Sequence, residues 1–318
     1  MLAYPMLGMA GFIPSCLEAG VPLGGSRPVA MTVAERFRRL GGELRLSSRV
    51  HRILLEDDRA VGVGLEDGSE VRADEVVWAA DGRTAIFELL GGRYLDDTIR
   101  RMYDQWIPVR SLVHVALGIA RDMSAEPANL ILGLDEPIVI AGEERRWLSV
   151  MQRAFDPSMA PPGKSVVEVW YPCRYEYWEE LGANPEWYAG EKDRIARLTI
   201  AALDRRWPGL AGQVEVVDVP TPLTYRRFTG NWRGSPDGWY VTPDNVRAAP
   251  LLALPGLHGF HMAGRWTAPF TGTVVAAWTG RQVVEILCRR EGRRFETSEP
   301  DGPWPPADRL AARESRTA

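Results

Sequence analysis

The feature that most constrains the fold is a short apolar run at residues 75–80, Glu-Val-Val-Trp-Ala-Ala. An apolar run of this length suits a strand that is buried on both faces, and such strands belong to parallel sheets. The four segments before it, residues 43–46, 49–56, 60–65 and 70–72, alternate as strands do, with turn residues at Asp57-Asp58 and Asp67-Gly68. We therefore expect a small antiparallel meander whose chain returns to a parallel sheet.

A helix is predicted over residues 26–40, directly before the meander. Its apolar side chains recur at helical spacing and share one face: Val29, Val33, Phe37 and Leu40. Ser26 suits the N-cap, Pro28 suits the first turn, and the two glycines at residues 41–42 end the helix. Helix, meander and return strand in this order describe the second half of a dinucleotide-binding fold.

The rest of the chain divides into a long middle region and a C-terminal unit. The middle region, residues 91–254, contains strand-like runs at 111–119, 148–152, 165–170 and 213–219, and one helix is predicted near 190–207. A buried strand at 259–264, a loop and a helix at 272–289 follow. The charged, proline-rich tail of residues 291–318 is predicted to be disordered.

Composition argues against several classes of function. The 42 acidic and 38 basic side chains leave a net charge of -4 without long runs of one sign, so nucleic acid is not an expected partner. The three cysteines are odd in number and far apart, and the four histidines have no Cys or carboxylate at ligand spacing. Neither a disulfide framework nor a metal site is predicted, and a reducing cytoplasm is the simplest compartment.

The C-terminal strand, loop and helix are the segment with the clearest chemical meaning. The helix begins at Gly272-Thr273-Val274, so its free backbone N–H groups attract negative charge. Small residues at these positions also allow a flat ring to approach the backbone closely. A reduced flavin, with negative charge at N1 and the neighbouring carbonyl, suits such a terminus.

Several motifs in the same order resemble those of phytoene desaturase-like FAD-dependent oxidoreductases, the group of carotenoid desaturases and isomerases and retinol saturase-like enzymes. Residues 261–269, His-Met-Ala-Gly-Arg-Trp-Thr-Ala-Pro, with Gly272 and residues 279–281, resemble the C-terminal flavin motif. Residues 24–28, Gly-Gly-Ser-Arg-Pro, with the glycines at 41–42 and the meander, resemble the central flavin segment. Residues 155–165, 221–222 and 228–230 resemble the substrate region.

The resemblance implies an α/β flavoprotein of the two-dinucleotide-fold type, N-terminally incomplete, with a mixed-sheet substrate domain. Residues 24–90 form the central segment of the FAD-binding domain, and residues 255–290 form its C-terminal segment. Residues 91–254 form the substrate domain, and residues 1–23 are a remnant of a substrate or cap region. The implied cofactor is FAD.

The resemblance also implies a set of residues that contact FAD. The backbone of Val50 lies against the adenine, and the segment around Ala80 and Asp81 lies near the pyrophosphate or ribityl chain. The C-terminal unit supplies the rest: Gly264 and Arg265 near the pyrophosphate and ribityl, and Gly272, Thr273 and Val274 at the isoalloxazine edge. Two departures from the family pattern stand out, because Phe270-Thr271 replaces glycine before the helix and Arg265 replaces a small, amide, His or acidic residue.

One expected element is missing from this sequence. A strand followed by a G-x-G-x-x-G turn and a helix should hold the pyrophosphate. The nearest match, Gly62-Val63-Gly64 with the next glycine at Gly68, has the wrong spacing and falls in the meander. We therefore expect that the chain lacks the N-terminal βαβ unit and that, alone, it binds FAD weakly or not at all.

The implied activity is hydride transfer between flavin and the carbon–carbon bonds of an apolar polyene or isoprenoid, as desaturation, isomerisation or saturation. Two alternatives stay open: a non-catalytic or split fragment that needs a separate N-terminal half, and an amine oxidase-type flavoenzyme. No catalytic residue is predicted, since ion pairing is the favoured interpretation of Arg153 and Asp156. An apolar substrate would favour peripheral contact with a membrane.

Overall fold

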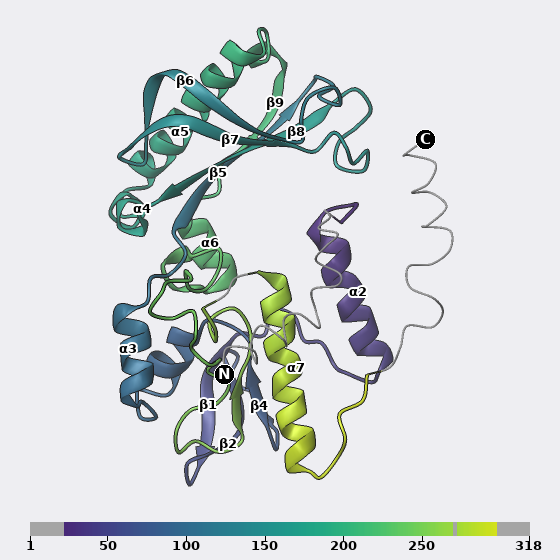
Figure 1. Cartoon of the computed structure of the whole chain (residues 1–318), viewed down its shortest axis with the longest axis vertical. Coiled ribbons are helices and arrows are strands. Elements are labelled where there is room, and N and C mark those ends of the chain that lie inside the picture. The colour runs from purple at the N-terminus through teal and green to yellow at the C-terminus, as the bar shows by residue number, and fades with distance from the viewer. Residues whose placement is uncertain (1–21, 270–271, 298–318) are drawn as a thin grey trace.

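The computed structural model describes residues 22–269 and 272–297, and Figure 1 shows two halves joined by several crossings of the chain. The predictions for residues 1–21, for Phe270 and Thr271, and for the tail beyond residue 297 lie outside the described residues. In the part that is described, no helix is both long enough and apolar enough to cross a membrane.

The predicted meander is present as a three-stranded antiparallel sheet. Its strands are β1 (Val50–Glu56), β2 (Arg59–Leu65) and β3 (Glu70–Arg72), in the order β1-β2-β3. Asp57 and Asp58 make the first turn with φ values of 44° and 58°, the left-handed geometry of a two-residue hairpin loop. The prediction of a further strand at residues 43–46 is wrong, because these residues form no strand and pair with none of the described strands.

The return to a parallel sheet is confirmed. Strand β4 (Val76–Trp78) pairs in parallel with β10 (Phe260–Met262), so segments about 180 positions apart share one small sheet. The expectation that the strand is buried on both faces is wrong for the described residues. Val76 is buried, but Val77 is 47% exposed.

The predicted N-terminal helix is α2 (Ser26–Arg39), but Gly25 rather than Ser26 occupies the N-cap position, without a side-chain capping bond. Gly41, with φ of 89°, follows the helix, as the glycine pair predicts. The predicted apolar face exists but is exposed, with exposed fractions from 44% to 70% for Val29, Val33, Phe37 and Leu40. The spacing of apolar residues predicts that the helix has an apolar face, but it does not predict whether another element covers that face.

Three helical segments pack around β4 and β10. They are the π-helical turn η2 (Thr84–Leu89), α3 (Asp97–Gln105) and α7 (Thr273–Arg290). The side chain of Asp96 accepts a hydrogen bond from the backbone of Ile99 at 2.8 Å and so begins α3. The core of this half includes Ile86, Tyr103 and Phe260.

The second half is built on a five-stranded sheet. Its strands are β5 (Ser111–Ile119), β6 (Asn129–Ile140), β7 (Glu143–Gln152), β8 (Ser165–Cys173) and β9 (Val214–Asp218), in the order β6-β7-β8-β5-β9. Every strand pair in it is antiparallel, so the prediction of a mixed sheet is wrong. Strand β6, which the sequence prediction missed, joins β7 through the tight turn at Ala141-Gly142, where both φ values are positive.

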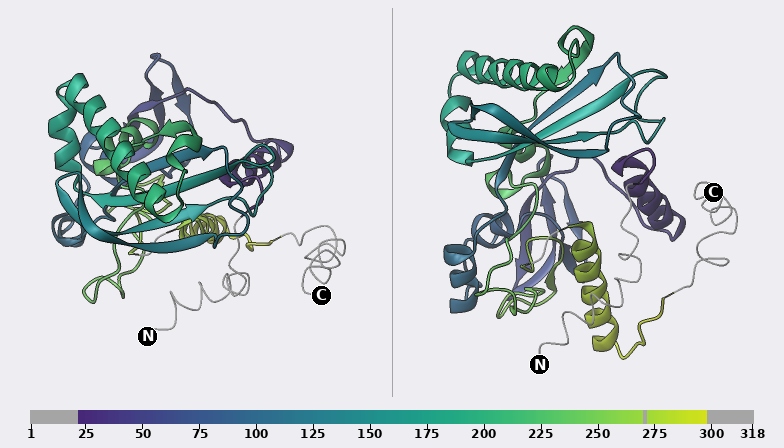
Figure 2. Two further views of the ribbon diagram at one scale, coloured as in Figure 1. Left: turned by 90° about the horizontal axis from the view of Figure 1, so that it is seen from above. Right: turned by 45° about the horizontal axis from the view of Figure 1, so that its top comes forward.

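One face of this sheet is covered by helices. Helices α4 (Tyr175–Gly182) and α5 (Pro185–Arg206) form the cover, and Asn184 caps α5 by accepting from the backbone of Glu186 at 2.9 Å. The core between them contains Val113, Val167 and Ile195, all of them inaccessible to solvent. Figures 1 and 2 show α5 on the side of the sheet that points away from β4 and β10, so the other face is open toward that half.

Short helical segments follow β9 and lead back toward β10. The turn η3 (Ala211–Gln213) comes directly before β9. After β9, helix α6 (Pro222–Thr229) and the turn η4 (Trp232–Gly234) lie between the five-stranded sheet and the half that contains β4 and β10. Thr221 and Thr224 form a capping box at the start of α6, and Gly230 ends it in the left-handed conformation.

Candidate functional site

A cavity of about 890 Å³ lies where β1 begins, β4 ends and α6 approaches from the other half. Three residues that the sequence predicts to contact a cofactor line it: Val50, Ala80 and Asp81. Ligands of α/β folds bind beyond the carboxyl ends of the parallel strands, which is where Ala80 and Asp81 follow β4. The structure therefore brings this part of the predicted site together.

Val50 begins β1 at an irregular point of the meander. It lies opposite Leu65, while Arg52 lies opposite Gly64, so His51 is an extra residue that forms a bulge. Strand β1 is also at the edge of its three-stranded sheet. Backbone polar groups near Val50 are therefore outside the strand ladder, which suits contact with the edge of a planar base.

Asp81 is turned inward although it borders the cavity. Its Oδ1 accepts from the backbone N–H of Thr84 and its Oδ2 from that of Trp232, both at 2.8 Å, and the residue is only 2% exposed. Burial raises the pKa of this carboxyl, and the hydrogen bonds offset only part of that effect. Ala80 is exposed and presents the accessible surface at this point.

The loop after β10 passes close to the loop after β4. The backbone N–H of Ala263 donates to the carbonyl of Trp78 at 2.9 Å. Gly264 has φ of 97°, and a Cβ on it would lie 3.3 Å from the carbonyl oxygen of Ala79. The backbone N–H of Gly264 donates to Oγ1 of Thr279 in α7 at 2.9 Å. Gly264 thus lies beside Ala79, the residue before Ala80.

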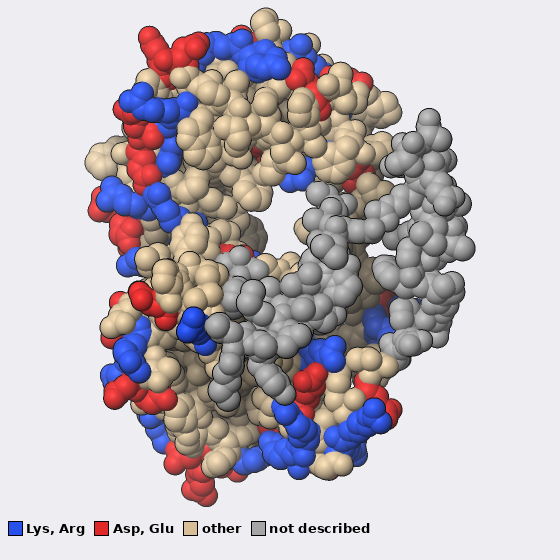
Figure 3. Space-filling view, in the orientation of Figure 1, with Lys and Arg blue, Asp and Glu red and all other residues tan. Residues whose placement is uncertain are grey.

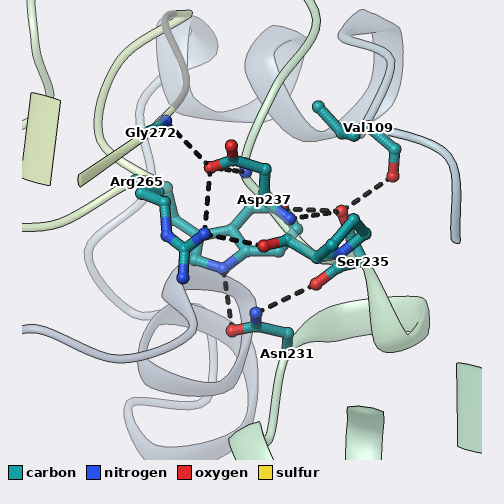
Figure 4. Close-up of polar contacts among 9 residues, drawn as sticks. Val109, Asn231, Ser235, Asp237, Arg265 and Gly272 are labelled. Carbon is teal, nitrogen blue, oxygen red and sulfur yellow. Dashed lines mark hydrogen bonds and ion pairs between the residues drawn. The ribbon is translucent and has the colours of Figure 1, made fainter. Parts of the chain in front are cut away.

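The remaining predicted residues lie around the start of α7. Figure 4 shows Arg265 and Gly272 converging on one carboxylate, that of Asp237. Nη1 of Arg265 lies 2.7 Å from the carbonyl oxygen of Pro236 and 3.4 Å from Oδ1 of Asp237, and the backbone N–H of Gly272 donates to the same Oδ1 at 3.3 Å. A carboxylate at this position interacts favourably with the positive end of the helix dipole.

Asp237 is the residue of this site that sequence reasoning missed. It stands 35 positions before Gly272 and 28 before Arg265, and no local spacing relates it to either. The implied position of Arg265 near the pyrophosphate and ribityl does not predict this carboxylate either. Thr273 and Val274 are exposed in the first turn of α7, and they do not line the 890 Å³ cavity.

The loop at residues 231–238 holds these parts together. The side chain of Asn231 accepts from Nε1 of Trp266 at 3.3 Å and donates to the carbonyl of Ser235 at 3.0 Å (Figure 4). Ser235 in turn donates to the carbonyl of Val109 at 2.7 Å. Trp239 is fully buried against Trp266, with ring centroids 5.2 Å apart in an edge-to-face arrangement.

The walls of the cavity carry many charged groups. Five arginines and four carboxylates line it: Arg49, Arg83, Arg226, Arg227 and Arg233, with Asp81, Glu88, Glu176 and Glu179. Arginine forms paired hydrogen bonds with phosphate oxygens, so these walls suit an anionic ligand. Gly272 leaves open space beside α7, since a Cβ there would meet no atom within 4 Å. The arginines of the cavity therefore suit the anionic part of a dinucleotide, and the open space beside Gly272 suits a flat ring.

An ionic group lies on the open face of the five-stranded sheet. Nε and Nη2 of Arg153 donate to Oε2 of Glu168 at 2.9 and 2.5 Å, and Nε2 of His114 lies 3.6 Å from Oε1 of Glu168. Burial lowers the pKa of His114, although Glu168 works in the opposite direction. The ion pair of Arg153 agrees with the prediction. Asp156 instead accepts from the backbone N–H groups of Gly24 and Ser158 at 2.6 and 3.0 Å and forms no ion pair with a described residue, so the prediction of ion pairing is wrong for Asp156.

No group of three or more His, Cys, Asp or Glu side chains in residues 22–269 and 272–297 is arranged to hold a metal ion. Cys173 is buried, and burial raises the pKa of its thiol to about 12, so it is not a nucleophile at neutral pH.

Known proteins share this fold and sequence pattern. The chain is 26% identical over 271 residues to a chloroplastic prolycopene isomerase of Arabidopsis thaliana, covering 81% of this chain and 44% of that protein. It is 25% identical over 279 residues to a lycopene-forming phytoene desaturase of a Paracoccus strain, covering 83% and 54%. The chain thus spans about half the length of the curated relatives it matches, and the predicted resemblance to phytoene desaturase-like enzymes is confirmed.

Solved structures agree at the level of the fold. An oxidoreductase from Methanosarcina mazei matches with a TM-score of 0.53 and 18% identity over 84% of this chain and 55% of that one. Cyclohexylamine oxidase from Brevibacterium oxydans matches with a TM-score of 0.52 and 17% identity over 83% and 53%. The α/β flavoprotein fold is therefore shown.

The sequence pattern of a known protein family also matches this chain and shows which family it belongs to. Residues 7–287 match the family described as flavin containing amine oxidoreductase. This match confirms the predicted cofactor, FAD, and the predicted enzyme class, an FAD-dependent oxidoreductase. The chain belongs to the flavin containing amine oxidoreductase family.

Proposed function

We propose that this chain forms part of an FAD-dependent oxidoreductase that acts on carbon–carbon bonds of an apolar polyene or isoprenoid substrate. The observation that carries the proposal is the open face of the five-stranded sheet. Large apolar side chains stand on it with much of their surface in contact with solvent: Ile131 is 65% exposed, Trp147 56% and Trp170 40%. Contiguous exposed apolar surface marks a binding site in a protein of this kind.

Strand register places these side chains on the same face. Trp170 lies opposite His114, and Trp147 lies opposite Gly133. Their neighbours in sequence, Val169 and Leu148, are fully buried on the α5 side, so the tryptophans point the other way. Figure 3 shows that the molecule is hollowed between this sheet and the half that contains β4 and β10. An elongated apolar molecule would lie along the sheet in this hollow.

The residues of this chain would orient the substrate and keep water away from one side of it. The tryptophans would hold the planar polyene, and the sheet would exclude water from one side of it. The flavin, when bound, accepts or donates the hydride. The start of α7 would lie near the flavin ring, where its backbone N–H groups favour negative charge. The relatives named prolycopene isomerase and phytoene desaturase support this substrate class.

The amine alternative has weaker support from the sheet. Glu168 is the partly buried carboxylate at its centre, and Arg153 already neutralises it through two hydrogen bonds. Asp218 is on β9, opposite Ala116 of β5, and is exposed at the edge of the same face. Among the described residues of this sheet face, an ammonium group would find no enclosed, unpaired carboxylate, which favours an uncharged substrate.

An anaerobic flavin assay tests the proposal. The chain, and the longest open reading frame that contains it, would be loaded with FAD and mixed with phytoene or prolycopene in detergent micelles. We expect a change in flavin absorbance or a new polyene isomer by chromatography. Reduction of the flavin by cyclohexylamine or putrescine, with no change of either polyene, would establish the amine alternative instead.

We also propose a location for the protein. Since polyenes partition into lipid, we propose a cytoplasmic protein in peripheral contact with a membrane.

A further inference from the structure

His114 stands on the open face of the five-stranded sheet, among the side chains proposed to hold the substrate. Its neighbours in β5, Val113 and Val115, are inaccessible to solvent on the α5 side, so the alternation of the strand turns His114 to the open face. Strand register places it opposite Trp170, and the two rings meet edge-to-face with centroids 5.6 Å apart. A titratable group therefore lies beside the aromatic surface that the polyene would contact.

The two ring nitrogens of His114 have different surroundings. Nε2 is buried without a hydrogen-bond partner among the described residues, and Oε1 of Glu168 lies 3.6 Å from it. The side chain keeps 17% of its surface exposed, and this exposed part does not include Nε2. Nδ1 is not buried in this way and accepts no hydrogen bond from a described residue, so it is the nitrogen that a ligand on the open face can reach.

Glu168 is held so that one of its oxygens is left for His114. Its Oε2 accepts two hydrogen bonds from Arg153, and the two side chains are only 15% and 19% exposed. The distance of 3.6 Å from Nε2 to Oε1 is too long for a hydrogen bond, but such contacts of acid and base groups often tighten only when a ligand is bound. Glu168 therefore favours the tautomer with the proton on Nε2, and it stabilises the ring when Nδ1 gains a second proton.

The groups around His114 keep its ring neutral near neutral pH. Burial lowers the pKa of His114 below the ordinary value of 6.5, Glu168 and Asp218 of β9 raise it in part, and Arg153 lowers it. Tyr225 of α6 is near the same two carboxylates, and burial, followed by their charges, raises the pKa of its hydroxyl. Tyr225 is therefore uncharged, and the imidazole is in the form that can accept a proton.

We propose that Nδ1 of His114 accepts the proton that the substrate loses in desaturation, with Glu168 and Arg153 as positioning residues. This inference rests on the proposed function, in which one C–H bond of the polyene gives its hydrogen and electron pair to bound flavin as hydride. Positive charge then develops on that carbon, and the neighbouring C–H bond becomes acidic. It releases its proton to Nδ1, and its electron pair becomes the second bond of the new C=C. Saturation reverses both transfers.

Anaerobic single-turnover kinetics of the FAD-loaded protein with phytoene test the inference. H114Q removes the proton acceptor and should slow the bleaching of flavin absorbance about 100-fold, while its affinity for lycopene, measured by fluorescence quenching, stays near the native value. H258Q is the matched control, since His258 is exposed before β10, and it should react at the native rate.

The dependence of this rate on pH tests the positioning by Glu168. In the native protein the rate should fall as pH falls through the pKa of His114, because the protonated ring accepts no further proton. E168Q removes a charge that raises this pKa, so the acid limb of its profile should lie at lower pH. An E168Q profile that coincides with the native one would overturn the assignment of Glu168.

Nitrogen NMR of the isotopically labelled full chain reads the state of His114 without turnover. We expect a proton on Nε2 and none on Nδ1 at neutral pH, and a proton on Nδ1 instead would overturn the inference. Equal phytoene oxidation by H114Q and the native protein, or native isomerisation of prolycopene without any phytoene oxidation, would also overturn it and keep the proposed function. The expected tautomer without action on either polyene would remove the proposed function and, with it, the proton transfer. Circular dichroism checks that each variant is folded, and E168Q and NMR decide if H114Q is not.

Discussion

The carboxylate of Asp81 accepts a hydrogen bond from the backbone N–H of Trp232 at 2.8 Å, across 151 positions of sequence. It ties the loop after β4 to the turn η4, and η4 leads into the loop that holds Arg265 and the start of α7. The second oxygen of Asp81 accepts from Thr84. One buried side chain thus connects the parts of the candidate cofactor site that come from distant segments.

Replacing Asp81 by Asn should therefore destabilise the protein. The variant keeps one acceptor oxygen but turns an amide N–H₂ group toward a backbone donor, and it leaves one buried N–H without a partner. We expect the free energy of unfolding to fall by about 1–3 kcal/mol, measured by urea denaturation. The exposed Asp104→Asn in α3 is the control and should change it little. Equal stability of both variants would show that the Asp81 bonds contribute nothing.

Glu75 should make stability depend on pH in the acid range. Arg59, Arg290 and His261 face its carboxylate, at 3.2, 2.5 and 2.9 Å. Burial would raise the pKa of Glu75, but the hydrogen bonds from Arg290 and His261 outweigh it and lower the pKa below the ordinary value of 4.5. The stabilisation is therefore complete above pH 4.5 and is lost as pH falls through the lowered pKa.

Comparison of E75Q with the native chain checks this dependence. At pH 6 the variant should be less stable by about 1–3 kcal/mol, and the difference should shrink when urea denaturation is repeated at successively lower pH. The exposed Glu56, which pairs with Arg72, supplies the control E56Q, expected to be close to native stability at each pH. A difference for E75Q that stays constant from pH 6 to below the lowered pKa would contradict the assignment.

Two glycine substitutions should shift stability in opposite directions. Gly234→Ala places a Cβ 2.0 Å from the carbonyl oxygen of Pro222 at a residue with φ of 56°, and should cost about 2–4 kcal/mol. Gly190→Ala lies within α5 with no atom within 4 Å of the new Cβ, and should stabilise by roughly 0.5–1 kcal/mol. Thermal denaturation should thus rank Gly190→Ala above the native chain and Gly234→Ala below it.

The tryptophans on the open sheet face should bind the substrate without supporting the fold. Trp147→Ala and Trp170→Ala should each weaken binding of lycopene in detergent micelles about tenfold, because each removes a large aromatic surface from the contact. Fluorescence quenching measures this affinity. Trp187→Ala on α5 is the control, since Trp187 is 67% exposed on an element that covers the opposite face. An equal loss of affinity in all three variants would place the substrate elsewhere.

Local patterns were sufficient for much of the fold. The alternation at residues 49–72 predicted the meander, the apolar run at 75–80 predicted the return strand, and glycine predicted the end of α2 and the start of α7. Each of these depends on neighbouring residues alone. The ordered motifs also led to the flavoprotein family and its cofactor, because their spacing is carried by the chain itself.

Other features depend on residues that meet only in the folded chain. Strand β6 and the fully antiparallel order of its sheet follow from pairing across hairpins, which single segments do not encode. Asp237 reaches Gly272, and Asp81 reaches Trp232, only because segments far apart in the sequence fold against one another. The arginines of α6 face Arg83 for the same reason. Sequence by itself determined the element types and the family, whereas tertiary structure decided which charges share a cavity, because electrostatic contact depends on distance in space and not on separation along the chain.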